Sequence, residues 1–267
     1  MQDAMTTQAD TLAERYAQTM DRVARAAERG GRRAEDILVI AVSKYAELDE
    51  IRELIELGHR DFGESRAPQL NQRAAMIGEW LGRKDRFGPA SSDPSGHEGG
   101  EVRWHMVGRL QRNKVKKLLP DVRLIHSVDS MRLAEELQGA ALKREIEVDG
   151  LLQVNVSGET VKAGVTIPAA VHVAESIDSM TYLRLRGLMT MAPLAERGED
   201  VRFVFERARS VFEDIRKAGV SEGAFNILSM GMSGDFETAI ECGANCVRIG
   251  TSIFGPRPAG SDDESDD

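Results

Sequence analysis

Short apolar runs alternate with longer amphipathic runs along most of the chain. Eight of the short runs have the composition of β-strands, and several are almost continuously apolar, as expected of parallel strands covered on both faces. Eight strands alternating with helices predict an α/β fold, a single (β/α)8 TIM-type barrel, with an open doubly wound sheet as the alternative. The predicted strands span residues 37–43, 60–63, 102–107, 124–128, 151–156, 183–189, 225–230 and 246–249.

The amphipathic runs carry the start and stop signals of helices. Residues 48–57 and 200–218 each place apolar side chains along one stripe, and a glycine follows each run. Pro68 and Pro168 suit the first turns of two further helices. A similar pattern over residues 12–29 predicts an extra N-terminal helix before the first strand.

Two stretches depart from this alternation. Residues 78–101 are rich in Gly, Pro and Ser, which predicts a mobile insertion between a helix and the third strand. Residues 258–267 end in SDDESDD, which predicts a disordered acidic tail. We therefore expect one barrel domain over residues 1–257, followed by the tail.

Composition narrows the class of protein further. Hydrophobic residues make up 41% of the 267 residues, enough for a sizeable core. No apolar run reaches the ~18 residues of a membrane-spanning helix, and the first residues lack the pattern of a signal peptide. Cys242 and Cys246 are too few for a disulfide scaffold and are expected to be buried, reduced thiols. We expect a cytoplasmic protein with no membrane contact, and a monomer by default.

The charge distribution argues against a nucleic-acid partner. The formal net charge is −9, and five acidic residues lie in the last seven, so the remainder carries −9 + 5 = −4. The basic run RLQRNKVKK at 109–117 is expected to be a solvated loop and helix start. No pair of histidines has metal-ligand spacing with a carboxylate. His105 and His126 are expected to make hydrogen bonds in the core or in a loop, whereas the exposed histidines should be His59, His97 and His172.

Lys44 follows the first predicted strand directly, in the sequence AVSK. Active groups of a (β/α)8 barrel lie at the carboxyl ends of its strands. A neutral lysine amine at such a position can form a Schiff base with an aldehyde. The alternative is a solvent-exposed lysine that merely ends a strand.

Two glycine-rich segments follow the last two predicted strands, SMGMSGD at 229–235 and RIGTSIFG at 248–255. Their backbone N–H groups and hydroxyls could converge on one anion, and these two loops are the usual phosphate site of the fold. The alternative is a pair of tight turns. A Schiff-base lysine opposite a phosphate site fits either a sugar-phosphate aldolase or a pyridoxal 5′-phosphate (PLP) site.

Eight motifs carry a resemblance to a known family: AVSK, FGE, WHMVGRLQRNK, HSVD, VNVSGETVKAG, GLMTM, LSMGMSGDFETAI and VRIGTSIFG. Their types and order resemble the pyridoxal phosphate homeostasis protein family of the YggS type. That family has the PLP-binding barrel also found in the N-terminal domain of alanine racemase. The resemblance covers about residues 37–255, apart from the 78–101 insertion.

The resemblance implies a set of cofactor-binding residues. Lys44 matches the lysine that binds PLP covalently as an internal aldimine, and Arg248 matches the arginine facing the pyridine nitrogen. Asn155 and Met189 match positions that line the cofactor. The residues in the phosphate-holding segments are Ser229, Gly231, Ser233, Gly250 and Thr251.

The sequence departs from the family after the second strand. The family usually has FGEN, whereas this chain has FGES, so Ser65 replaces an asparagine and any contact through that amide is in doubt. Glu64 and Arg66 remain candidates for the rim of the site.

Arg248 also has an interpretation from elementary chemistry. A permanent cation beside the pyridine nitrogen disfavours protonation of the ring, which weakens the ring as an electron sink and restricts reactivity. The alternative is an arginine paired with a carboxylate inside the barrel.

Three functions compete. The first is a PLP-binding protein that stores or delivers the cofactor within the cell without turnover, with apo PLP-dependent enzymes as recipients. The second is a PLP-dependent amino-acid racemase or decarboxylase. Racemisation needs a second acid/base group, which a C-terminal-domain tyrosine supplies in the alanine racemase relatives, and Tyr16, Tyr45 and Tyr182 do not fall in such a domain. The third is an aldolase without a cofactor, in which Lys44 attacks a sugar phosphate directly.

Overall fold

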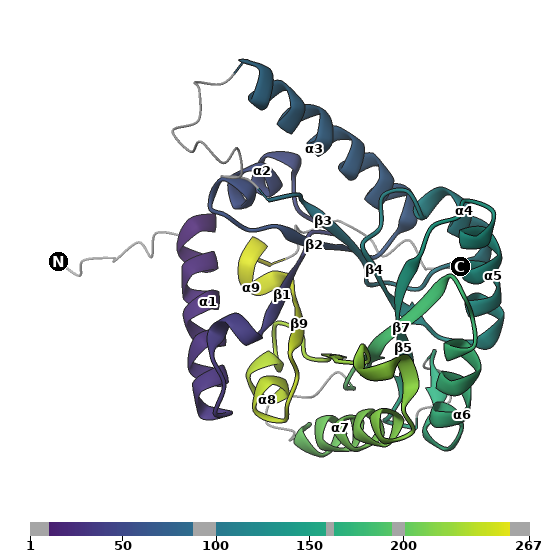
Figure 1. The fold of residues 1–267 in the computed structure, drawn as a ribbon. Coiled ribbons are helices and arrows are strands. Elements are labelled where there is room, and N and C mark those ends of the chain that lie inside the picture. Colours follow the sequence, from purple (N-terminus) through teal and green to yellow (C-terminus); the bar gives the residue numbers. More distant parts are fainter. Residues whose placement is uncertain (1–10, 88–99, 159–162, 194–200, 257–267) are drawn as a thin grey trace.

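Eight parallel strands form a closed barrel in the computed structural model, which describes residues 11–87, 100–158, 163–193 and 201–256, with the backbone alone at 85–87 (Figure 1). The barrel strands are β1 (Leu38–Val42), β2 (Asp61–Glu64), β3 (Arg103–Met106), β4 (Leu124–Val128), β5 (Val148–Asn155), β7 (Leu183–Met189), β8 (Ile227–Ser229) and β9 (Cys246–Ile249). They are hydrogen-bonded in the order β4-β3-β2-β1-β9-β8-β7-β5, and β4 also pairs with β5, which closes the ring. The predicted barrel is confirmed, and the open doubly wound sheet is excluded.

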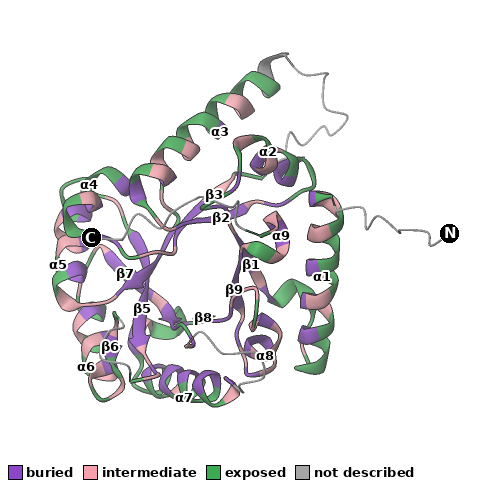
Figure 2. Cartoon of the chain, turned by 180° about the vertical axis from the view of Figure 1, so that it is seen from behind, coloured by how far each residue is buried: buried purple, intermediate pink, exposed green. Residues whose placement is uncertain are grey.

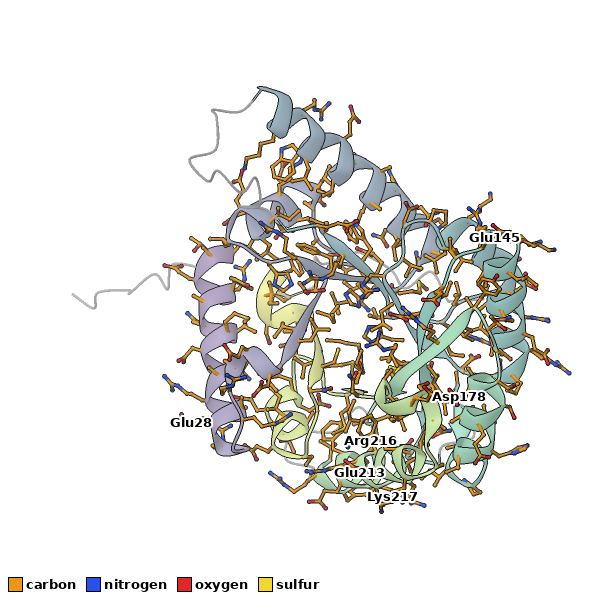
Figure 3. All side chains as sticks on the ribbon, viewed as in Figure 1. Glu28, Glu145, Asp178, Glu213, Arg216 and Lys217 are labelled. Carbon is orange, nitrogen blue, oxygen red and sulfur yellow. The ribbon has the colours of Figure 1, made fainter. Side chains whose placement is uncertain are left out.

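Helices surround the barrel and turn their buried faces toward the strands (Figure 2). A two-residue strand, β6 (Val165–Thr166), adds to β5 outside the ring. Charged side chains such as Glu213, Arg216 and Lys217 lie on the outward face of their helix (Figure 3). The helices are α1 (Leu12–Arg29), α2 (Leu48–Glu56), α3 (Ala67–Phe87), α4 (Val115–Leu118), α5 (Met131–Leu142), α6 (Ile167–Asp178), α7 (Arg202–Lys217), α8 (Phe236–Glu241) and α9 (Thr251–Phe254), with 3-10 turns at Ala34–Asp36, Arg112–Lys114 and Val220–Gly223.

The extra N-terminal helix α1 is confirmed at the predicted residues and packs against α8 and α9. It begins with a capping box between Thr11 and Glu14, which satisfies backbone donors that the first turn leaves unpaired. Arg15 Nε donates to the carbonyl of Ile253 at 2.9 Å, and Arg22 pairs with Glu237 at 2.8 Å. The helix therefore supports both short helices that follow the glycine-rich loops.

The space that the strands enclose is filled by side chains (Figure 3). One part is a small apolar cluster of Leu124, Leu151 and Met189, with Ile227 packed against it. Several buried polar side chains also lie on the barrel strands, whereas branched apolar residues usually fill a barrel of this type. Among them are Asp61, His105, His126, Ser229 and Arg248.

Helix α3 corrects one prediction. It continues to Phe87, so the first ten residues of the predicted 78–101 insertion are helical. Helix-forming residues and side-chain contacts extend it: Glu79 pairs with Arg83 at 2.8 Å, and Lys84 Nζ lies 5.2 Å from the Trp80 ring centre. Residues 88–99 of the insertion and the predicted tail at 258–267 lie outside the described residues.

His59 corrects a second prediction, because its side chain is buried rather than exposed. Its ring packs edge-on against Tyr16 and Phe62, and Nε2 lies 2.8 Å from the carbonyl oxygen of Asp61. His97 lies outside the described residues. Both cysteines are buried and free, as predicted. Among the helices in the described ranges, none combines the length and apolar composition that crossing a bilayer requires.

Candidate functional site

Lys44 lies two residues beyond the end of β1, at the carboxyl-terminal rim of the barrel. Its side chain is exposed, and Nζ lies 4.7 Å from the centre of the Tyr45 ring. Reactive groups of (β/α)8 barrels gather at this rim. The predicted lysine is therefore accessible to a ligand at the barrel mouth.

The turn that carries Lys44 is held by two side chains from α3. Gln69 Nε2 donates to the carbonyl of Lys44 at 3.0 Å. The guanidinium of Arg73 donates to the carbonyl of Ser43, and its Nη2 donates to that of Ala46 at 2.6 Å. Hydrogen bonds to the carbonyls of Ser43, Lys44 and Ala46 thus hold the backbone at the lysine and on both sides of it. The sequence did not single out Gln69 or Arg73, and their only signal is the four-residue spacing on one helix face.

Glu64 forms a buried cluster with Ser43 and Arg73 behind this turn. Its Oε1 accepts from the Ser43 hydroxyl at 2.5 Å and from Arg73. Burial raises the pKa of Glu64, and Arg73 opposes this shift. Among the described residues, Glu64 Oε2 has no hydrogen-bond partner. Glu64 therefore lies beneath the rim, where it supports the turn rather than facing the mouth.

The loop after β8 depends on Gly231. Its φ is +94°, and a Cβ at this position would lie 2.6 Å from the Cβ of Ala239. Its carbonyl accepts from the backbone N–H of Arg248 at 3.0 Å. Only glycine fits this conformation without strain, and it docks the loop against β9.

Ser233 joins the two glycine-rich loops. Its Oγ accepts from the backbone N–H of Gly250 at 3.1 Å and from that of Ser252 at 3.3 Å. A Cβ on Gly250 would lie 3.3 Å from the carbonyl of Val42, so the second loop abuts the end of β1 that carries Lys44. Ser233 Oγ thus orients two backbone N–H groups of the second loop, which abuts the end of β1 that precedes Lys44.

The predicted phosphate residues fall into two groups. The structure gathers Gly231, Ser233, Gly250 and Thr251 in the two adjoining loops, with Thr251 exposed at the start of α9. Ser229 instead lies inside the barrel, where its hydroxyl accepts from Arg248. The position of Ser229 at the end of β8 did not indicate that its side chain would lie inside the barrel rather than in the loop.

Arg248 is buried within the barrel and contacts neutral oxygens. Nη1 donates to the Ser229 hydroxyl at 2.6 Å, and Nη2 donates to the carbonyl of Thr190 at 2.9 Å. Burial lowers its pKa, and Cys246 and Asp235 oppose this shift. The sequence also allowed Arg248 to be paired with a carboxylate inside the barrel. Within the described part of the chain, Arg248 makes no such ion pair. The cation is therefore positioned but not neutralised by contact.

Asn155 and Met189, which were predicted to line the cofactor, lie in different surroundings. The Asn155 side chain accepts from the backbone N–H of Gly158 at 3.0 Å and from the Ser157 hydroxyl at 3.3 Å. Met189 is buried in the apolar cluster of the barrel interior. That these two residues line the cofactor stays a prediction.

The rim candidates after β2 differ in exposure. Arg66 is exposed and Ser65 is half-buried. A Cβ on Gly108 would lie 2.3 Å from the carbonyl oxygen of Ser65, so the β2 and β3 loops touch through backbone atoms. This contact involves the main chain of Ser65 and does not depend on the missing amide.

The barrel, its rim lysine and its paired loops define the class of PLP-binding barrels typified by the N-terminal domain of alanine racemase. Residues 13–258 match that family, described as "Alanine racemase, N-terminal domain". More specifically, the chain belongs to the pyridoxal phosphate homeostasis protein family. The protein of that name from Aquifex aeolicus is 36% identical over 91% of this chain and 97% of its own length. That from Escherichia coli K12 is 33% identical over 92% and 97%.

Solved structures agree with this assignment. PipY of Synechococcus elongatus with PLP bound has a TM-score of 0.74 and 28% identity, covering 92% of this chain and all of PipY. An alanine racemase from Clostridium difficile has a TM-score of 0.63 at 14% identity, with 57% of its length covered. This second likeness shows the shared barrel fold alone.

Proposed function

We propose that the protein binds PLP at the barrel mouth and holds it covalently as an internal aldimine on Lys44. The single observation that carries this proposal is the exposed lysine beside two loops that Ser233 joins. The loops would bind the phosphate, and the lysine amine would react with the aldehyde. PipY, which has PLP bound, supports the choice of ligand.

Arg248 would lie toward the pyridine nitrogen, as the family resemblance implies. Its guanidinium is held by Ser229 and Thr190 without contacting a carboxylate in the described residues, so its charge stays available. A cation at this place disfavours protonation of the ring and keeps it a weak electron sink. This chemistry supports retention of the cofactor more than turnover of an amino acid.

We further propose that the protein stores or delivers PLP within the cell and does not use it in catalysis. The names of the relatives support a role in PLP homeostasis. The recipients would be apo PLP-dependent enzymes, and cytoplasmic location and a monomeric state stay predictions. Racemase or decarboxylase activity is the alternative, and turnover of any amino acid by the PLP-loaded protein would favour it.

Borohydride trapping tests the covalent assignment. The protein is incubated with PLP, reduced, digested and analysed by peptide mass spectrometry. We expect a visible absorption band before reduction and a pyridoxyl group on Lys44. Lys44→Ala should lose both signals, whereas Lys117→Ala, a change at another exposed lysine, should keep them.

Four outcomes would contradict the proposal. Absence of visible absorption with PLP would exclude an aldimine, and trapping of a sugar phosphate on Lys44 without PLP would favour an aldolase. A label on another lysine alone would assign the cofactor elsewhere. Thermal unfolding of Lys44→Ala should match the wild type, and a large loss of stability would indicate a structural role for Lys44.

A further inference from the structure

A continuous chain of buried hydrogen bonds crosses the barrel interior. It begins at Asp61, the first residue of β2, whose Oδ1 lies 3.0 Å from His105 Nε2. His105 Nδ1 lies 3.2 Å from His126 Nε2, and His126 Nδ1 lies 3.0 Å from Ser229 Oγ. Ser229 Oγ then accepts from Arg248 Nη1 at 2.6 Å. The chain connects the amino-terminal end of one strand to the arginine of the proposed cofactor site.

Asp61 at the far end is held as a carboxylate. Arg103 contacts both of its oxygens, through Nε at 2.7 Å and Nη2 at 2.5 Å. Burial opposes ionisation, but the hydrogen bonds from Arg103 and His105 outweigh it and hold the pKa of Asp61 well below its usual range. Both Asp61 and Arg103 line a cavity of about 420 Å³ that lies near the amino-terminal ends of β1 and β2.

The surroundings of the two imidazoles favour their neutral forms. Burial lowers the pKa of His105 even though Asp61 opposes the shift. Burial also lowers the pKa of His126 strongly, and His105 and Arg248 lower it further. Burial raises the pKa of the Cys246 thiol, which lies beside Ser229, to about 11. Arg123 also faces His105 electrostatically and disfavours its protonation.

If both histidines are neutral, the donor and the acceptor of each hydrogen bond in the chain are determined. A carboxylate can only accept, so His105 must carry its proton on Nε2 and accept at Nδ1. His126 must then donate from Nε2 and accept at Nδ1, and the Ser229 hydroxyl must donate to it. Arg248 can only donate, and one of the two lone pairs of Ser229 accepts from it. The Asp61 carboxylate alone fixes the direction of the chain, because Ser229 could accept from Arg248 in either direction.

We propose that Asp61, His105 and His126 are positioning residues for Arg248. The carboxylate at one end of the barrel sets the tautomers of both histidines, and these orient the Ser229 hydroxyl so that its lone pair faces Arg248. The chain brings no negative charge near the arginine, because all of its members between Asp61 and Arg248 are neutral. The direction of the chain follows from this protein alone, whereas its effect on the cofactor rests on the proposed function.

The histidine tautomers test the direction without any cofactor. Nitrogen-15 NMR of the full chain should show both His105 and His126 as neutral Nε2–H tautomers at pH 7. Asp61→Asn should remove the preference and give mixed tautomers at both rings, because an amide can donate as well as accept. Asp149→Asn is the matched control: it changes another buried carboxylate, which pairs with Arg123, Arg184 and Arg186 and, within the described part of the chain, makes no hydrogen bond to either histidine.

An Nδ1–H tautomer or a charged ring at either histidine in the wild type would overturn the proposal. Retention of a single Nε2–H tautomer in Asp61→Asn would overturn the control by Asp61. The wild-type spectrum decides the direction even if this variant does not fold.

Two substitutions of His126 test the positioning of Arg248. Asparagine places its amide near the former Nδ1 and keeps a group that can accept from Ser229, whereas glutamine places its amide near the former Nε2. We expect PLP to bind about tenfold more weakly to His126→Gln than to His126→Asn. Equal affinities for the two variants would overturn the positioning role. Failure of the wild type to bind PLP would overturn the proposed function and leave the tautomer test standing.

Discussion

Gln69 Nε2 donates to the carbonyl oxygen of Lys44 at 3.0 Å, so a residue of α3 holds the backbone of this lysine. Arg73, one helical turn further along α3, holds the carbonyls of Ser43 and Ala46. Lysine side chains are long and flexible, and the position of the amine depends on where its backbone is fixed. Helix α3 therefore sets the starting point of the Lys44 side chain at the barrel mouth.

Removing the cation of Arg73 should destabilise the protein strongly. Arg73→Met leaves the buried carboxylate of Glu64 with the Ser43 hydroxyl as its remaining partner in the described part of the chain, and it removes one donor from each of the Ser43 and Ala46 carbonyls. We expect the free energy of unfolding to fall by about 3 kcal/mol, because a buried charge loses its counter-ion. Urea unfolding at pH 7 measures this change.

Arg52→Met is the matched control for that substitution. Arg52 pairs with Asp49, which is largely exposed, so the same change should cost less than about 1 kcal/mol. Adding Glu64→Gln to Arg73→Met should recover part of the loss, since no uncompensated charge remains. Equal costs for the two arginine variants would show that the Glu64–Arg73 pair contributes little.

Ser233→Ala should loosen the connection between the two glycine-rich loops. The backbone N–H groups of Gly250 and Ser252 lose their shared acceptor. We expect PLP affinity to fall about tenfold, which corresponds to the ~1.4 kcal/mol typical of one good hydrogen bond. Titration with PLP, followed by visible absorbance, measures the dissociation constant.

Ser252→Ala provides the comparison, because its hydroxyl makes only a 3.4 Å contact to the carbonyl of Ser233. Its affinity should stay within about threefold of the wild type. If both serine variants bound PLP equally well, the convergence of donors on Ser233 would not contribute to the site.

Strand positions and the rim residues could be predicted because they depend on local pattern. Parallel strands covered on both faces read as apolar runs, and the polar residue that ends such a run, as Lys44 does, lies at the rim by the geometry of the barrel. Gly231 and Gly250 were also recognisable, since Gly250 follows β9 directly and Gly231 lies two residues beyond the end of β8.

Contacts between distant elements could not be predicted in the same way. The positions of Gln69 and Arg73 follow from how α3 packs against β2 and β3, which brings these side chains to the turn after β1, and single-sequence periodicity does not specify that packing. His105 and His126 were expected to make hydrogen bonds, but the sequence left open whether they lie in the core or in a loop, and their contact to each other depends on the register of β3 and β4. The burial of His59 similarly depends on Tyr16, which α1 brings across the end of the barrel.

Gly231→Ala should destabilise the loop after β8. Alanine would have to adopt a φ of +94°, and its Cβ would lie 2.6 Å from Ala239 Cβ and 2.9 Å from Phe236 Cα. We expect a loss of about 3 kcal/mol from the unfavourable backbone and the overlap together. Gly234→Ala is the control in the same loop, since a Cβ there meets no atom within 4 Å, and its cost should be below ~1 kcal/mol. Similar melting temperatures for the two variants would contradict a special requirement at Gly231.

The unfolding free energy should decrease as the pH falls below about 6.5, where histidines of the unfolded chain take up protons. Burial, with smaller contributions from His105 and Arg248, lowers the pKa of His126 in the fold. Between these two pKa values the unfolded state binds a proton that the folded state does not, so low pH favours unfolding, by up to ~1.4 kcal/mol per pH unit for one histidine. His126→Asn removes this contribution, while those of His59 and His105 remain, and its stability should fall less steeply than that of the wild type. Urea unfolding of both proteins from pH 7.5 to 5.0 measures the two slopes, and parallel curves would show that His126 titrates in the fold as it does in the unfolded chain.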